Sequence, residues 1–107
     1  MPSRGHLPGW AVTITIWLSL VVGLSGCSMA PPVQEMSDAR QALQAARDAR
    51  AQVRAPDPMR QAEMSMVQAT AALEDGRYER AREHALAAKR HAIEARSSAS
   101  EADEHQP

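Results

Sequence analysis

Alanine at helical spacing is the feature that most restricts how this chain can fold. Between Tyr78 and Ala102, alanines recur at alternating steps of three and four residues. This spacing returns to one side of an α-helix at every turn. Alanine is also the best helix former, because its side chain loses no rotamer freedom on ordering. The pattern therefore predicts a long helix with a narrow alanine row along one side. The row comprises Tyr78, Ala81, Ala85, Ala88, Ala92, Ala95, Ala99 and Ala102.

Two further helices are predicted before this one, because apolar residues there follow the same spacing. In the first helix the row is broken only by Arg50, and in the second it is continuous. The first row comprises Met36, Ala39, Leu43, Ala46, Arg50 and Val53, and the second comprises Met59, Ala62, Met66, Ala69 and Leu73.

Proline and glycine mark the boundaries between these helices. Pro56 disfavours helical geometry at Ala55, so the first helix should end there. We expect Asp57 to be the N-cap of the second helix, with Pro58 at the first helical position. Gly76 suits the left-handed residue that closes the second helix.

The sequence thus predicts an all-α domain over residues 34–98, an antiparallel three-helix arrangement with short turns, and a frayed tail over 99–107. Its second half, from Met59 to Ala95, resembles a tetratricopeptide-type hairpin. The residues that carry this resemblance are Ala69, Leu73, Gly76, Tyr78, Ala81, Ala85 and Ala88. A generic alanine-rich hairpin explains the same pattern equally well.

The predicted core is thin. Alanine buries little apolar area, and Trp10 and Trp17 lie before the domain, so Tyr78 is its only aromatic residue. At about 25 cal/mol per Å², such a core should be marginal for an isolated domain. We therefore expect oligomerisation, a partner, or both.

The first 26 residues have the layout of an export signal. Arg4 gives a cationic start, an apolar stretch follows from Trp10 to Val22, and small residues precede Cys27, the only cysteine. Leu24, Ser25, Gly26 and Cys27 resemble the lipobox of bacterial prolipoproteins. A permanent membrane helix is the alternative, but it needs roughly 20 apolar residues, and this stretch is shorter.

The lipobox resemblance implies that residues 1–26 are cleaved and that Cys27 is acylated, palmitate being a typical chain. Residues 27–33, with Pro31 and Pro32, then form a lipidated tether. No Asp follows Cys27 at the second position, since Ser28 and Met29 stand there. In Gram-negative lipoproteins this implies anchoring in the outer membrane, facing the periplasm.

The mature domain as a whole resembles a domain family of unknown function found in short Gram-negative lipoproteins. Related copies in that family precede peptidoglycan-binding domains, and none follows here. The resemblance spans roughly Gln34 to Ser98 and implies an envelope role without a known activity. It is carried by Ala39-Arg40-Gln41-Ala42, Ala45-Ala46-Arg47, Ala55-Pro56 and Leu73 to Ala81.

Composition weighs against several function classes. Without Arg4, 11 of the 12 basic residues remain against 13 acidic ones, so we expect no nucleic-acid partner. The serines have no glycine-rich elbow and Cys27 is used by the anchor, so we expect no enzyme and no cofactor beyond the covalent lipid.

Histidines raise the question of a metal site. His84 and His91 fall on one side of the third predicted helix, and Glu94 follows three residues later. Neutral imidazoles are good metal ligands. However, both histidines neighbour charged residues on the predicted solvent face, so we predict no metal site.

These observations favour a membrane-anchored, non-enzymatic lipoprotein that acts as a periplasmic helical interaction module. Its alanine rows would bind another envelope protein or a second copy. One alternative is a self-associating structural protein resembling the murein lipoprotein, although Pro56 and Pro58 interrupt a continuous coil. A metal-binding envelope protein is a less favoured alternative.

Overall fold

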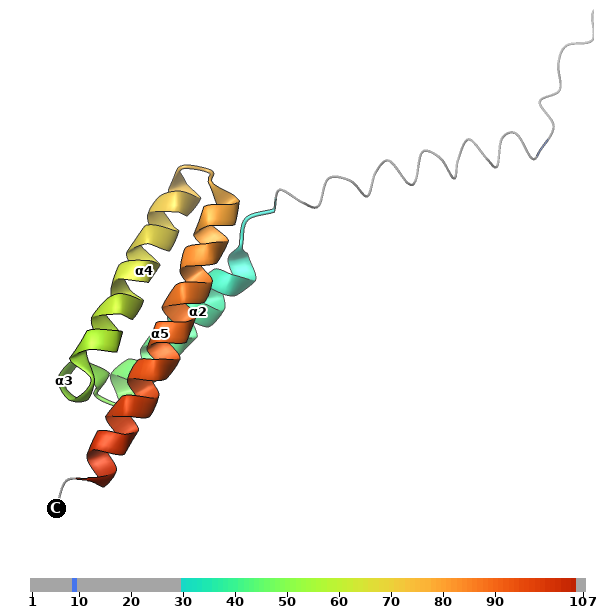
Figure 1. The fold of residues 1–107 in the computed structure, drawn as a ribbon. Helices are drawn as coiled ribbons and strands as arrows, with labels where there is room; N and C mark the ends of the chain where they lie inside the picture. The colour runs from blue at the N-terminus through green and yellow to red at the C-terminus, as the bar shows by residue number, and fades with distance from the viewer. Residues whose placement is uncertain (1–8, 10–29, 106–107) are drawn as a thin grey trace, which may run out of the picture. The chain divides into compact units, whose positions relative to one another are not determined.

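The computed structural model describes Gly9 and residues 30–105. Chain contacts divide the molecule into two compact units, Met1–Ala30 and Pro31–Pro107, and the second unit is described below. The described part contains no strand, which confirms the all-α prediction (Figure 1). Its helices are α2 (Val33–Asp48), α3 (Ala51–Arg54), α4 (Pro56–Glu74) and α5 (Tyr78–Glu104).

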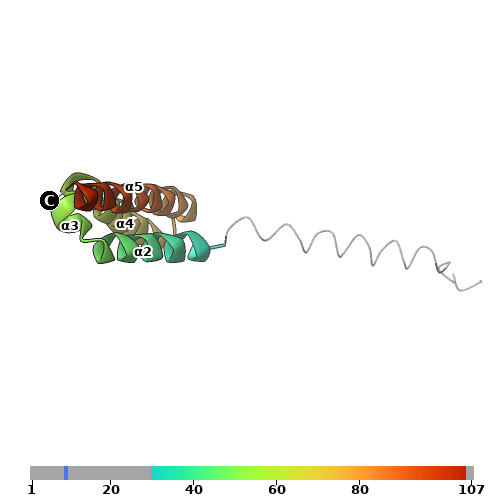
Figure 2. The same cartoon turned by 90° about the horizontal axis from the view of Figure 1, so that it is seen from below.

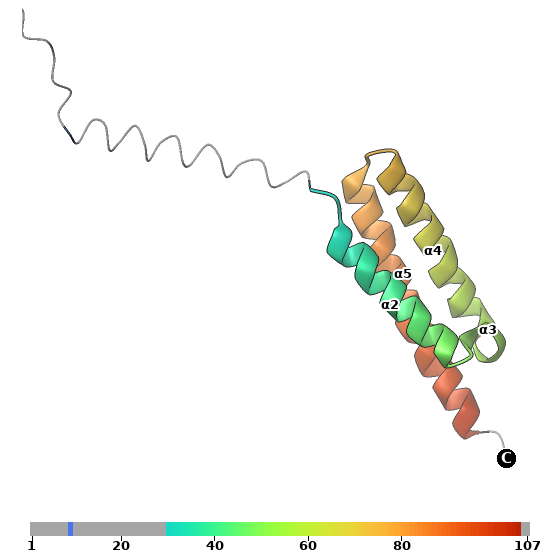
Figure 3. The ribbon, with the colours of Figure 1, turned by 180° about the vertical axis from the view of Figure 1, so that it is seen from behind.

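The longest helix, α5, is the one on which the others pack (Figures 1 and 3). Ala62 of α4 shares a core cluster with Ala95, whereas Ala69 shares one with Ala85, so α4 and α5 are antiparallel. Ion pairs join Glu35 of α2 to Arg82 and Asp38 of α2 to Lys89. The later residue of α2 pairs with the later residue of α5, so α2 and α5 are parallel. The predicted three-helix arrangement is therefore confirmed with successive long helices antiparallel, and Figure 2 shows α2 lying alongside α5.

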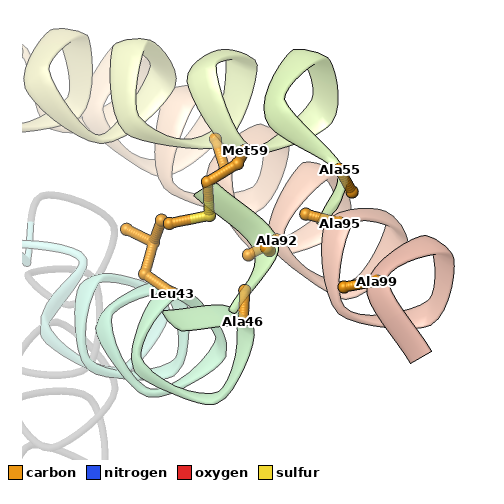
Figure 4. Packing of buried hydrophobic residues seen from close by; sticks show 9 residues of the cluster. Leu43, Ala46, Ala55, Met59, Ala92, Ala95 and Ala99 are labelled. Carbon is orange, nitrogen blue, oxygen red and sulfur yellow. The ribbon is translucent and has the colours of Figure 1, made fainter. Parts of the chain in front are cut away.

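The core is built on the alanine row of α5. Six of its members are fully buried, and we call these six the alanine seam: Ala81, Ala85, Ala88, Ala92, Ala95 and Ala99. Small side chains let two helix backbones approach closely, so α2 and α4 both lie against the seam. Larger apolar side chains fill the space between helices, and Figure 4 shows Leu43 and Met59 meeting beside Ala46 and Ala92. Full burial of one such side chain contributes about 1.5–3 kcal/mol.

The first predicted helix does not run unbroken to Val53. α2 ends at Asp48, and Arg50 adopts a left-handed conformation with φ 61° before the short α3 begins. Val53, predicted to face the core, is 76% exposed. Ala51 and Ala55 are buried instead, in the cluster that contains Ala99. The break thus turns the chain toward the C-terminal part of α5, whereas a continuous helix would have led the chain away from α5.

The start of α4 also differs from the prediction. α4 begins at Pro56, and Ala55 is its N-cap, with the extended φ of −142° favoured before proline. Asp57 is therefore not the cap but lies in the first turn, where it pairs with Arg60. Pro56 suits the first helical position because its missing N–H has no partner there. The negative charge of Asp57 is favourable at a helix N-terminus.

The turn between α4 and α5 follows the prediction. Gly76 has a positive φ of 73°. Its N–H donates to the carbonyl oxygen of Leu73 at 3.0 Å, and the N–H of Arg77 donates to the carbonyl oxygen of Ala72 at 2.8 Å. These two bonds form a Schellman motif, which satisfies carbonyls at the helix end. Glycine takes this conformation without the steric cost of a Cβ atom.

Both ends of the folded unit extend beyond the predicted boundaries of 34 and 98. α5 continues to Glu104, Ala99 is fully buried, and Arg54 pairs with Asp103 at 2.6 Å, so the tail does not fray from residue 99. At the other end Pro32, expected in the tether, is buried and stands at the N-cap of α2.

Replacing Arg50 with glycine should stabilise the domain, because the left-handed conformation costs a residue with a Cβ atom roughly 1–2 kcal/mol. Part of this gain is offset by the greater freedom of glycine in the unfolded chain. We expect Arg50→Gly to raise the unfolding free energy by about 0.5–1 kcal/mol. Urea unfolding followed by helical circular dichroism measures this change.

The matched control is Arg40→Gly, an exposed position inside α2. There the same substitution should lower stability by about 1 kcal/mol. Equal destabilisation by both variants would contradict the left-handed break at Arg50.

Candidate functional site

The predicted lipidation site lies outside the described residues. Leu24, Ser25, Gly26 and Cys27 all precede Ala30, so acylation of Cys27 stays a prediction. None of the helices between residues 30 and 105 is both long and apolar enough to cross a membrane.

The histidines on α5 do not form a ligand cluster with Glu94. The Nδ1 atom of His91 lies 3.7 Å from a carboxylate oxygen of Glu94, too far for a hydrogen bond. His84 is half-buried about two helical turns before His91, on the same side of α5. Among the described residues, no three His, Cys, Asp or Glu side chains are grouped as metal ligands.

Ion pairs connect the first half of α2 to α5. The Arg82 Nε donates to Glu35 at 3.0 Å, and its Nη1 donates to Glu79 of the same helix at 2.8 Å. The Lys89 Nζ donates to Asp38 at 3.3 Å. Partly exposed pairs contribute about 0.2–1 kcal/mol each, so they set the register of α2 on α5 more than they stabilise it.

The environment of Glu35 favours its charged form. It lies in the first turn of α2, where a hydrogen bond with its own backbone N–H and then the bond from Arg82 lower its pKa. In turn, the bond to Glu35 raises the pKa of Arg82 above its ordinary value. The two groups hold the start of α2 against α5.

A second row of residues lies on the outward side of α4, away from the core. It begins and ends with a charged residue, its central members are apolar, and its steps alternate between four and three residues. We call it the outer row: Arg60, Met64, Val67, Ala71 and Glu74. All five side chains are exposed. Met64 is 62% exposed and Val67 is 69% exposed, so these large apolar groups are uncovered in the folded chain.

Two shallow hollows adjoin this row and share Val67. The first, of about 420 Å³, is lined by Arg60, Glu63, Met64, Val67 and Gln68. The second, of about 320 Å³, is lined by Met66, Val67, Thr70, Ala71 and Glu74. An exposed apolar strip with polar borders is typical of a binding surface for an amphipathic helix.

The outer row was not predicted from the sequence. The apolar row predicted for this helix contains Met59 and Met66, and burial is confirmed for Met59, which is 1% exposed. Met66 is half-buried, whereas Met64 belongs to the outer row. The alternating four- and three-residue steps of the outer row are visible in the sequence. However, the predicted core row of this helix, which contains Met59 and Met66, has the same alternation of steps, so spacing alone does not tell which row faces outward.

The structure also corrects the expected mode of binding. We expected the alanine rows to bind a partner, but the alanine seam is fully buried inside this chain against α2 and α4. A surface that is buried inside the folded domain is not accessible to another protein. The outer row of α4 is the better candidate for an interaction surface.

Comparison with known proteins identifies a family to which most of the chain corresponds. Residues 34–106 match the model of a family described as Domain of unknown function (DUF4398). The chain belongs to this family. The sequence resemblance to a family of unknown function is thus confirmed, and the matched region covers α2 to α5. No curated protein and no solved structure matches the chain.

The contact between Glu35 and Arg82 makes the stability of this family domain depend on pH. Because the pKa of Glu35 is lower in the folded chain than its ordinary 4.5, its charge stabilises the fold above that pH. This contribution is lost as the pH falls through the folded pKa. Glu35→Gln should therefore lower the melting temperature at pH 7, and the difference from wild type should shrink as the pH falls below 4.5.

Glu83→Gln makes the same chemical change at an exposed position of α5 and is the control. We expect it to leave the melting temperature unchanged at pH 7. A constant gap between Glu35→Gln and wild type from pH 7 to pH 3 would contradict the assigned role of the carboxylate.

Proposed function

We propose that this chain is a lipid-anchored helical interaction module of the bacterial cell envelope. Acylated Cys27 would hold it in the outer membrane facing the periplasm, and the domain would bind a protein partner without performing chemistry. The observation that carries the binding role is the outer row of α4, which exposes Met64 and Val67 on a helix whose other side is buried.

Several features of the outer row support binding to another helix. Single exposed apolar residues are common on protein surfaces and need no explanation. Here, however, Met64, Val67 and Ala71 repeat at the spacing that two packed helices use, and hollows lie on either side of Val67. Covering these side chains would add to the apolar area that the alanine core lacks.

The anchor supports the proposal by concentrating the domain. The lipobox resemblance at Leu24 to Cys27 implies several acyl chains, and each buried methylene contributes about 0.8 kcal/mol to membrane binding. Only three residues separate Cys27 from the folded unit that begins at Pro31. Confinement near one surface raises the effective concentration, so a modest helix interface is sufficient for binding.

The anchor is tested by metabolic labelling of cells with an alkyne analogue of palmitate. Wild-type protein should incorporate the label and sediment with the outer membrane fraction. Cys27→Ala should lose both the label and the membrane association, because no other thiol is present in the chain.

Ser28→Ala, which changes the next residue and leaves the lipobox intact, is the control and should behave as wild type. Label on Cys27→Ala, or its absence from wild type, would overturn the lipid-anchored part of the proposal.

A further inference from the structure

The charges at the two ends of the outer row have opposite signs. Arg60 lies seven residues before Val67, and Glu74 lies seven residues after it. Seven residues are about two helical turns, or roughly 10.5 Å along the axis. Val67 is therefore the midpoint of a row that is positive at one end, apolar in the middle and negative at the other end.

We infer that the outer row binds the outer row of a second copy of this chain, with the two α4 helices antiparallel around Val67. A two-fold axis through Val67 brings Arg60 of each copy to Glu74 of the other. It also brings Met64, three residues before the axis, to Thr70 and Ala71, three and four residues after it. This inference rests on the proposed binding role of the outer row and names its partner.

The two hollows fit the same two-fold arrangement. One lies on the Arg60 side of Val67 and the other on the Glu74 side, and Val67 lines both. Under the two-fold rotation, Arg60 and Met64 from the lining of the first hollow face Ala71 and Glu74 from the lining of the second hollow of the other copy. A closed symmetric dimer requires this kind of pairing of one patch with the same patch on its partner.

The charge pattern favours this partner over other arrangements. In a parallel pair, Arg60 would face Arg60 and Glu74 would face Glu74, which is unfavourable at both ends. An anionic lipid surface would be repelled by Glu74 in the second hollow, whereas in the first hollow Glu63 offsets the charge of Arg60. A second copy in the antiparallel arrangement places opposite charges together at both ends.

The interface is expected to be weak, because a row on one helix covers less than the roughly 800 Å² per partner of a standard complex. Arg60 also pairs with Asp57 of its own chain, at a position where both side chains are largely exposed. Dimerisation therefore depends on the concentration that the anchor supplies, and the test uses the full chain in membranes.

The first experiment places a thiol on the two-fold axis. The full chain carrying Val67→Cys is treated in isolated membranes with a short thiol-to-thiol cross-linker and separated by denaturing electrophoresis. We expect a homodimer whose identity is confirmed by mass spectrometry. Ser97→Cys, on the exposed side of α5, is the control and should give little dimer.

The second experiment exchanges the charges in the Val67→Cys background. Arg60→Glu and Glu74→Arg should each reduce the cross-linked dimer about tenfold, because symmetry changes two ion pairs at once. The double variant restores opposite charges and should return the dimer to its original level. Both residues are exposed on the side of α4 away from the core, so we expect both variants to keep the fold.

The outcomes separate this inference from the proposed function. Self-pairing would be overturned if Val67→Cys gave no more cross-linked homodimer than the Ser97→Cys control. It would also be overturned if the double charge variant gave as little homodimer as the single charge variants. Cross-linking of Val67→Cys to a different protein would also overturn it while leaving the interaction module in place. A failure of the anchor shows separately, as missing palmitate label on the wild-type chain.

Discussion

The close approach of α2 and α4 to α5 is the contact on which the rest of this fold depends. Alanine makes it possible, because a row of methyl groups keeps two backbones near each other along the whole of α5. The same row supplies little apolar area, so Met36, Met59 and Leu43 fill the space between the helices. The resulting core is narrow, contains no buried polar side chain among the described residues and leaves the outward side of α4 without a partner.

The helix breaks follow from the need to keep every helix on the alanine seam. α2 has to stop near the end of α5, and the left-handed Arg50 with α3 moves the chain sideways so that Ala51 and Ala55 join the cluster around Ala99. Pro56 then starts α4 in the opposite direction. Gly76 reverses the chain a second time and brings Arg82 to Glu35.

Much of this fold could be predicted from spacing and from proline and glycine, because the alanine seam and Gly76 have strong local causes. The break at Arg50 could not, since arginine has no preference for the left-handed conformation and tertiary packing imposes it. The outer row could not be separated from the inner row of α4, because Met64 and Met66 belong to rows of the same spacing. Which row faces inward is decided by contact with α5.

The most direct test of the account is to enlarge side chains within the alanine seam. Ala85→Leu and Ala92→Leu add apolar volume at two fully buried positions of the seam, and each should lower the urea unfolding free energy by about 1–3 kcal/mol. Ser97→Leu, exposed on the same helix, should change it by less than about 0.5 kcal/mol. Unchanged or increased stability for the two seam variants would contradict the claim that close alanine packing on α5 holds the domain together.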